Sequence, residues 1–259
     1  MGEIREISFE EEPADIKDKV KSYWTKRAKG FAELKCEEAV GLKAQLWRKE
    51  LLSGLFLEQG PEEARNRKIH ILDVGCGTGF FEMILAPLGF NMTGIDLTPE
   101  MIREGHERLK QYEPETVRLM VMDAEQTEFP DESFDAVITR NLTWTLPHPV
   151  EAYREWFRVL KPGGILLNFD AEYAKGFHRY DQSQNCAHAG IGGAMKEECH
   201  NIYHMLSISS FERPAWDLDV LGKVGFREVT ADCSVGDRIY KDPDPFYMPD
   251  RMFAVRAMK

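Results

Sequence analysis

Long apolar runs, a signal sequence and a set of pairable cysteines are all missing from this sequence of 259 residues. No apolar run approaches the roughly 18 residues that a membrane span needs. The opening residues, MGEIREISFEEEP, are acidic, whereas a signal peptide is first basic and then apolar. Five cysteines, an odd number with no framework spacing, suit free thiols in a reducing compartment. We therefore predict a cytoplasmic location and no membrane partner.

Basic residues are also in short supply. Lys and Arg together number 33 against 44 Asp and Glu, which gives a net charge of −11. This is the opposite of the phosphate-neutralising surface on which nucleic-acid binding relies. The balance predicts no nucleic-acid partner and favours a small-molecule or protein substrate. With 43% hydrophobic residues, the chain can bury the core of one large domain, or of a domain with a small appendage.

Three regions of different pattern follow one another along the chain. Residues 16–57 carry apolar side chains at three- and four-residue spacing, which predicts a helical cap within residues 1–60. Short apolar strands then alternate with amphipathic helices, the pattern of a parallel sheet covered on both faces. The strands are expected at 69–74, 91–96, 117–122, 134–139, 164–170, 227–233 and 252–257.

The last two of these strands are separated by a segment rich in proline and aspartate, which predicts a hairpin-like pair at the sheet edge. The expected fold is therefore a doubly wound α/β domain over residues 61–259. Its sheet has seven strands and is mostly parallel, with an antiparallel edge strand. A segment of irregular composition at about 171–213 is expected to form a lid inserted after the fifth strand.

A turn rich in glycine follows the first expected strand. Gly75, Gly77 and Gly79 in "ILDVGCGTGF" remove every second side chain, so that backbone N–H groups can approach a polar ligand closely. The spacing differs from the Gly-x-Gly-x-x-Gly fingerprint of dinucleotide-binding proteins. The second strand ends in Asp96, where a carboxylate can accept hydrogen bonds from both hydroxyls of a ribose. We therefore predict a ligand that contains a nucleoside.

Four segments in order resemble the motifs of class I S-adenosylmethionine-dependent methyltransferases that act on small molecules. They are "LDVGCGTGFF", "TGIDLTPEMI", "VMDAEQTEFPDESFDAVI" and "FRVLKPGGILL". The resemblance implies a Rossmann-like fold, S-adenosylmethionine as cofactor and S-adenosylhomocysteine as product. It also implies a methyltransferase in which an in-line displacement needs chiefly proximity, alignment and exclusion of water.

The resemblance assigns cofactor contacts to residues near the strand ends: Asp73, Gly75, Gly77, Gly79, Asp96, Leu97, Met101, Asp123, Ala124 and Arg140. Asp73 would help to position the amino group and Asp96 the ribose hydroxyls. Leu97 and Met101 would pack against the adenine, whose polar edge would meet Asp123 and the Ala124 backbone. Two of these assignments have a purely structural alternative, because Asp73 can brace the turn and Leu97 can belong to the core.

The N-terminal segment "VKSYWTKRAKGF" resembles the part of such enzymes that closes over the cofactor. Tyr23, Trp24, Arg27 and Phe31 would share roughly one helix face. Arg27 would meet the cofactor carboxylate, while the aromatic rings exclude water. The alternative for these aromatic residues is simple core packing.

The acceptor side is less well defined. "RNLTWTLPHP" carries Asn141 and Trp144 where many small-molecule relatives have histidines. Asn141 would orient an acceptor through its amide. Trp144 would form a wall of the pocket or face a cation, or else belong to the core.

The lid segment is rich in histidine and cysteine: His178, Cys186, His188, Cys199, His200 and His204. Three hypotheses follow. The first is a polar acceptor pocket with His200 or His204 as the base, and the second is a merely structural lid. The third is a site for zinc, or for a soft metal or metalloid substrate, in which His200 and His204 are joined by Cys186, His188 or Cys199. No pair matches a well-known ligand spacing, so we predict no metal.

Other functions remain as alternatives to a small-molecule methyltransferase. A protein or RNA methyltransferase would need a recognition surface for its acceptor, and a non-catalytic cofactor-binding protein would keep the same turn and Asp96. The sequence does not indicate the acceptor, the atom that is methylated or the oligomeric state.

Overall fold

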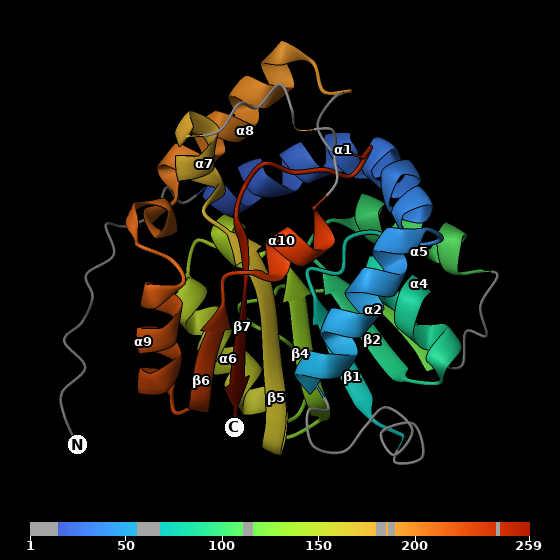
Figure 1. Ribbon diagram of the computed structural model, residues 1–259, viewed down its shortest axis with the longest axis vertical. Helices are drawn as coiled ribbons and strands as arrows, with labels where there is room; N and C mark the ends of the chain where they lie inside the picture. The colour runs from blue at the N-terminus through green and yellow to red at the C-terminus, as the bar shows by residue number, and fades with distance from the viewer. Residues whose placement is uncertain (1–14, 56–67, 111–115, 180–184, 186–189, 242–243) are drawn as a thin grey trace.

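The structure is a computed structural model that describes residues 15–55, 68–110, 116–179, 185, 190–241 and 244–259 (Figure 1). Seven strands form one sheet in the order β3-β2-β1-β4-β5-β7-β6. They are β1 (His70–Val74), β2 (Asn91–Asp96), β3 (Val117–Val121), β4 (Phe134–Arg140), β5 (Leu160–Ala171), β6 (Arg227–Asp232) and β7 (Met252–Met258).

The first five strands pair in parallel, and β7 is antiparallel to both β5 and β6. The predicted doubly wound α/β fold with seven strands is confirmed. The predicted late pair lies at one edge of the sheet, where β7 runs against the other strands and β6 is outermost. The strand order reverses between β1 and β4, so the carboxyl ends of these two strands leave a crevice between them.

Helices cover both faces of the sheet (Figure 1). One face packs against α2 (Leu42–Leu55), α4 (Phe80–Leu85), α5 (Pro99–Leu109) and α10 (Val235–Ile239). The other packs against α6 (Pro149–Val159) and α9 (Ala215–Val224). Because successive strand residues point to opposite faces, Ile71 belongs to the first core and Leu72 to the second. This burial on both faces explains why the central strands, such as β1 and β4, are mainly apolar.

A third layer lies over the carboxyl ends of the strands, where Figure 1 shows α1 (Ile16–Glu38) across the sheet with α7 (Tyr173–Arg179) and α8 (Gly193–Met205) above it. These helices share an apolar cluster that includes Ile16, Tyr23 and Ile202. The predicted long helical segment is thus divided into α1 and α2. Since α2 packs against the sheet, we propose that the cap is confined to α1. Within the described ranges, no helix is long and apolar enough to cross a membrane.

Among the residues that the structure describes, three short 3₁₀ helices form connections around the sheet. They are η1 (Ala86–Leu88), η3 (Thr143–Thr145) and η6 (Ser207–Ser210). The second of them directly follows β4 and carries Trp144, so it contributes to the rim of the crevice.

Candidate active site

The glycine turn after β1 adopts a backbone that side chains would not allow. Gly75, Gly77 and Gly79 have φ angles of +69°, +57° and +82°, in the left-handed region that glycine enters without a steric penalty. A Cβ atom at Gly75 would also lie 2.8 Å from a methyl carbon of Leu142. The N–H groups of Gly75 and Cys76 both donate to the carbonyl oxygen of Ile95, at 2.8 and 2.9 Å, which fastens the turn to β2.

Asp96 ends β2 directly beside this turn. Its carboxylate accepts hydrogen bonds from the N–H of Gly77 at 3.1 Å and from the N–H of Thr98 at 2.8 Å. Burial raises the pKa of Asp96, although these backbone N–H groups oppose the shift. The carboxylate therefore organises the turn and also borders the crevice.

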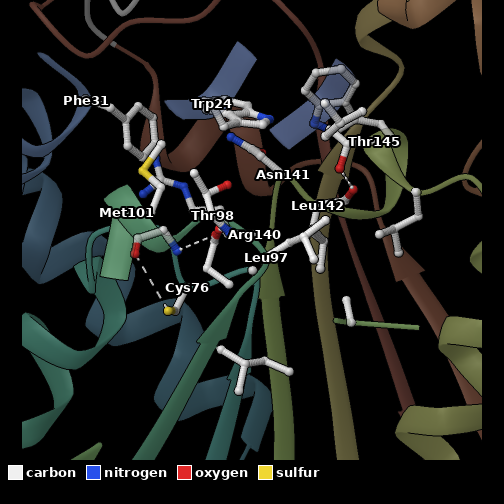
Figure 2. Close-up of a pocket in the computed structure, with 18 of the residues that line it drawn as sticks. Trp24, Phe31, Cys76, Leu97, Thr98, Met101, Arg140, Asn141, Leu142 and Thr145 are labelled. Carbon is white, nitrogen blue, oxygen red and sulfur yellow. Dashed lines mark hydrogen bonds between the residues drawn. The ribbon is translucent and has the colours of Figure 1, made fainter. Parts of the chain in front are cut away.

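A pocket lies between the strand ends and α1. Figure 2 shows Trp24 and Phe31 at its upper side, with Cys76, Leu97 and Arg140 among the residues below and around it. Most of the predicted cofactor residues line this pocket: Asp73, Gly75, Gly77, Asp96, Leu97, Met101, Asp123, Ala124 and Arg140. Gly79 is not among the lining residues; it is the N-cap of α4 and lies close to Leu109. Asp123 is held at the rim by Lys17 of α1, whose ammonium lies 2.6 Å from its carboxylate.

Two of the four residues predicted on one face of α1, Trp24 and Phe31, lie on the face that the structure turns to the pocket. Trp24, Phe31 and Lys35 follow one another at helical spacing and line the pocket. Tyr23 and Arg27 do not line it; Tyr23 is buried against α8 and borders a smaller cavity with Cys199, and the charge of Arg27 acts on the Cys199 thiol. Tyr23 and Arg27 are four positions apart and therefore share one face of α1. This face is turned toward the lid.

A network of buried charges, which sequence reasoning did not identify, lies under the pocket. Glu38 is fully buried and accepts from the Lys35 ammonium at 2.5 Å, from Arg140 Nη2 at 2.8 Å and from the Trp47 indole N–H at 3.2 Å. Arg140 Nη2 also lies 2.7 Å from the Tyr240 hydroxyl. Burial and the Arg140 charge lower the pKa of Lys35 to about 8 although Glu38 opposes the shift, and so Lys35 is a cation at neutral pH.

Arg140 retains donor groups for a ligand. Its guanidinium lies over the rings of Trp47 and Phe80, 4.2 and 4.7 Å from their centroids. The buried Nε and Nη1 groups have no hydrogen-bond partner among the described residues. Because unpaired buried donors are costly, these N–H groups are suited to an anionic group in the pocket.

A pair of buried carboxyl groups lies beneath the turn. Burial and the neighbouring Glu82 raise the pKa of Asp73 well above its usual value. Glu82 is fully buried in α4, and burial raises its pKa to about 7. Burial and Glu82 also raise the pKa of the Cys76 thiol well above the ordinary value, so the thiol stays protonated at neutral pH and is no nucleophile.

The raised pKa of Glu82 predicts a pH-dependent loss of stability. The folded form binds this proton more tightly than the unfolded form does, so stability falls as pH rises from the usual carboxyl value to about 7. We expect Glu82→Gln to remove this dependence. The melting temperature of the variant minus that of the wild type should increase between about pH 5 and about pH 8. The exposed Glu33→Gln of α1 is the matched control, and a difference for Glu82→Gln that does not vary with pH would contradict the prediction.

Asn141 and Trp144, the residues predicted to meet the acceptor, both line the pocket. Asn141 has a φ of +56°, a strained value for a residue other than glycine. Its amide oxygen accepts a hydrogen bond from the Tyr173 hydroxyl at 2.7 Å. Trp144 is buried against Tyr203 and Tyr173, with ring centroids 4.1 and 5.2 Å away. Trp144 thus both lines the pocket and belongs to the apolar cluster of the lid.

The lid histidines are not brought to this pocket. His200 and His204 lie on α8, but that helix turns Cys199, Ile202 and Tyr203 inward. Neither histidine is among the residues that line the pocket, so the proposed role of a base for the acceptor has no support from the geometry. Cys186 and His188 lie outside the described residues.

Several pocket residues escaped sequence reasoning for identifiable reasons. Met248 and Tyr203 reach the pocket from segments far along the chain, and no motif marks them. Lys35 carried a usable signal, because it follows Trp24 and Phe31 at helical spacing. The spacing showed that these three side chains share one face of the helix. It did not show whether that face would be turned toward the sheet.

Comparisons with known proteins agree with this arrangement. A family described as "Methyltransferase domain" matches residues 72–168. The chain is similar to the ubiquinone/menaquinone biosynthesis C-methyltransferase UbiE of Nitrobacter hamburgensis, with 34% identity over 168 residues, 62% of this chain and 66% of the relative. It is also similar to a demethylmenaquinone methyltransferase of Listeria welshimeri, with 34% identity over 128 residues, 48% of this chain and 50% of the relative. The chain thus spans only half to two thirds of the length of these curated relatives.

A solved structure shows the same fold at low sequence identity. It is a putative S-adenosyl-L-methionine-dependent methyltransferase from Methanococcus maripaludis, with a TM-score of 0.54 and 16% identity over 92% of this chain and 94% of that chain.

Proposed function

Because the chain belongs to the class I S-adenosylmethionine-dependent methyltransferases, we propose that it transfers a methyl group to a small-molecule acceptor in the pocket under α1. One observation carries the proposal: a single pocket joins Asp96 and the glycine turn to the aromatic residues that α1, α7 and η3 contribute. The cofactor is S-adenosylmethionine, which supplies an activated methyl group on a sulfonium when it is bound. The expected compartment is cytoplasmic, on the cysteine usage alone.

The residues of the pocket suit this cofactor. Asp96 offers acceptor oxygens for the two ribose hydroxyls, and Leu97 and Met101 offer an apolar surface for the adenine. The unpartnered N–H groups of Arg140 suit the carboxylate of the methionine portion, a role that the sequence had suggested for Arg27. Asp73 at the turn suits the amino group.

Water exclusion is the task of α1 in this proposal. Trp24 and Phe31 lie with their ring centroids 5.6 Å apart and close the pocket above the turn. A displacement at carbon needs its two reactants held in line and the pocket free of competing water, so these aromatic side chains contribute to rate rather than to bond making.

The acceptor is proposed to be a flat, largely apolar molecule that needs no histidine base. The acceptor side carries Trp144, Tyr173, Tyr203 and Met248, and no histidine lines the pocket within the described part of the chain. Burial raises the pKa of Tyr173 and Tyr203 well above their usual value, so their hydroxyls stay protonated at neutral pH and cannot act as bases. Compounds that already carry a nucleophilic atom are therefore favoured. The names of the two curated relatives, a ubiquinone/menaquinone biosynthesis C-methyltransferase and a demethylmenaquinone methyltransferase, support a ring compound of this kind.

The test is transfer of a labelled methyl group. The purified chain is incubated with methyl-labelled S-adenosylmethionine and a cell extract separated into small molecules, protein and RNA. We expect label in the small-molecule fraction, which then supplies a compound to identify. Label confined to protein or RNA would overturn the small-molecule acceptor, and cofactor binding without any transfer would favour a non-catalytic binding protein.

Substitution of Asn141 tests the acceptor side. We expect Asn141→Gly to lower turnover about tenfold, because one hydrogen bond to the acceptor is lost, while the affinity for S-adenosylhomocysteine stays unchanged. Asn141→Ala should lower turnover equally and also lower the melting temperature, since alanine is strained at a φ of +56° and glycine is not. Steady-state kinetics and calorimetric titration separate the two effects. Unchanged turnover in Asn141→Gly would remove Asn141 from the acceptor site.

A further inference from the structure

Three histidines of the lid come together on two helices. His178 lies on α7, and His200 and His204 lie one turn apart on α8. One ring nitrogen of each can be chosen so that all three lie within 4.8 Å of one another. The ring centroids of His200 and His204 are 4.2 Å apart, and that of His178 is 5.3 Å from His200. Imidazole nitrogens are thus gathered from both helices of the lid.

The spacing of these nitrogens fits a tetrahedral metal centre. Two imidazole ligands at about 2.0–2.1 Å from Zn²⁺ lie roughly 3.3–3.4 Å apart when they subtend a tetrahedral angle. His178 Nε2 and His204 Nε2 are 3.4 Å apart. A direct N–H···N hydrogen bond at that distance would be long and weak.

The surroundings of His200 are a second observation that favours a metal site, after the spacing of the nitrogens. Its Nδ1 atom is buried and has no hydrogen-bond partner among the described residues. The negative charge of Glu197 acts on the same imidazole ring and can offset part of the charge of a cation held there. The His200 ring is further held by the neighbouring Phe177 ring, with centroids 4.5 Å apart.

We propose that His178, His200 and His204 bind one divalent first-row cation, with Zn²⁺ the best fit, and thereby fasten α7 to α8. Three protein nitrogens leave the fourth tetrahedral position to water or to an outside ligand. This site is separate from the methyl-transfer pocket, because none of the three histidines lines that pocket.

The histidine site lies on the same two helices as two tyrosines of the pocket. Tyr173 at the start of α7 and Tyr203 of α8 both line the acceptor side of the pocket. A cation bound by the three histidines would join α7 to α8. It would thereby fix the position of Tyr173 relative to Tyr203. Metal occupancy would therefore stiffen the lid without contributing an atom to the reaction.

The experiment is a metal titration of the full chain without a histidine tag. After treatment with a chelator, the protein is titrated with Zn²⁺ in the presence of a chromophoric competitor. We expect one equivalent to bind and the melting temperature to rise, because a ligand that binds only the folded form stabilises it. Co²⁺ in place of Zn²⁺ should give the intense visible absorption typical of four-coordinate cobalt.

Single substitutions assign the site. His178→Ala, His200→Ala and His204→Ala should each weaken Zn²⁺ binding more than about 100-fold, since even the outer partners of metal ligands are worth about 10–100-fold. His106→Ala, at an exposed histidine of α5, is the matched control and should bind as the wild type does. Affinity that is equal in the wild type and the three lid variants, or the lack of any binding by the wild type, would overturn the proposal. Melting of each variant without metal verifies that it is folded.

Discussion

Asp96→Ala is expected to abolish measurable cofactor binding. The carboxylate is the one charged acceptor at the end of β2, and two hydrogen bonds from ribose hydroxyls to a charged group are worth about 3–6 kcal/mol together. This corresponds to a loss of about 10²- to 10⁴-fold in affinity. The N–H groups of Gly77 and Thr98 also lose their acceptor, so the turn itself becomes less ordered. Calorimetric titration with S-adenosylhomocysteine measures the effect.

Two comparisons make the Asp96 result specific. Asp96→Asn keeps one acceptor oxygen but loses the charge, and an intermediate affinity is expected. Asp131→Ala removes a carboxylate that is 75% exposed and pairs with Arg158 outside the pocket, and its affinity should equal that of the wild type. If the affinity of a folded Asp96→Ala variant lies within about threefold of the wild type, a gap of under 1 kcal/mol, Asp96 does not hold the ribose.

Glu38→Ala is expected to cause the largest loss of stability. The substitution leaves Lys35 and Arg140 as buried cations without their shared carboxylate, and breaking a buried ion pair in this way costs about 3–5 kcal/mol. The indole N–H of Trp47 loses its acceptor as well. For a chain of this size, we expect a fall in melting temperature of roughly 6–20 °C. Denaturant unfolding gives the free energy directly.

The matched control for Glu38 is its neighbour on the same helix. Glu37 is exposed, so Glu37→Ala should change the free energy of unfolding by less than about 0.5 kcal/mol. A loss below about 1 kcal/mol for Glu38→Ala would show that water or a rearranged side chain replaces the carboxylate.

Cofactor affinity should also fall in Glu38→Ala, because Arg140 loses the contact that holds its guanidinium over Trp47 and Phe80.

The pH dependence of the same network has a definite sign. Burial alone would raise the pKa of Glu38, but the charges of Arg140 and Lys35 outweigh it and lower the pKa to about 2. The folded form therefore binds this proton less tightly than the unfolded form does. The stabilisation is present above the usual carboxyl pKa and is lost as the pH falls toward 2, and Glu38→Ala should lose this part of the acid sensitivity.

Local patterns in the sequence determined the sheet and the cofactor side of the site. The central strands β1 and β4 are buried on both faces, so their apolar runs are visible without knowledge of their neighbours. The glycine turn and Asp96 belong to one strand–helix–strand unit in which chain connectivity fixes the geometry. Nothing distant along the chain is needed to place Asp96 beside Gly77, and the structure brings them within hydrogen-bond distance.

Only the tertiary structure decided the face of α1, the partners of Arg140 and the grouping of the lid histidines. Arg140 meets Glu38 across 102 residues and Tyr240 across 100. His178 meets His204 across 26 residues. The periodicity of a helix shows which side chains share a face, but the direction of that face depends on the packing of the helix against the sheet and the lid. The long-range contacts that fix this packing leave no regular spacing in the sequence.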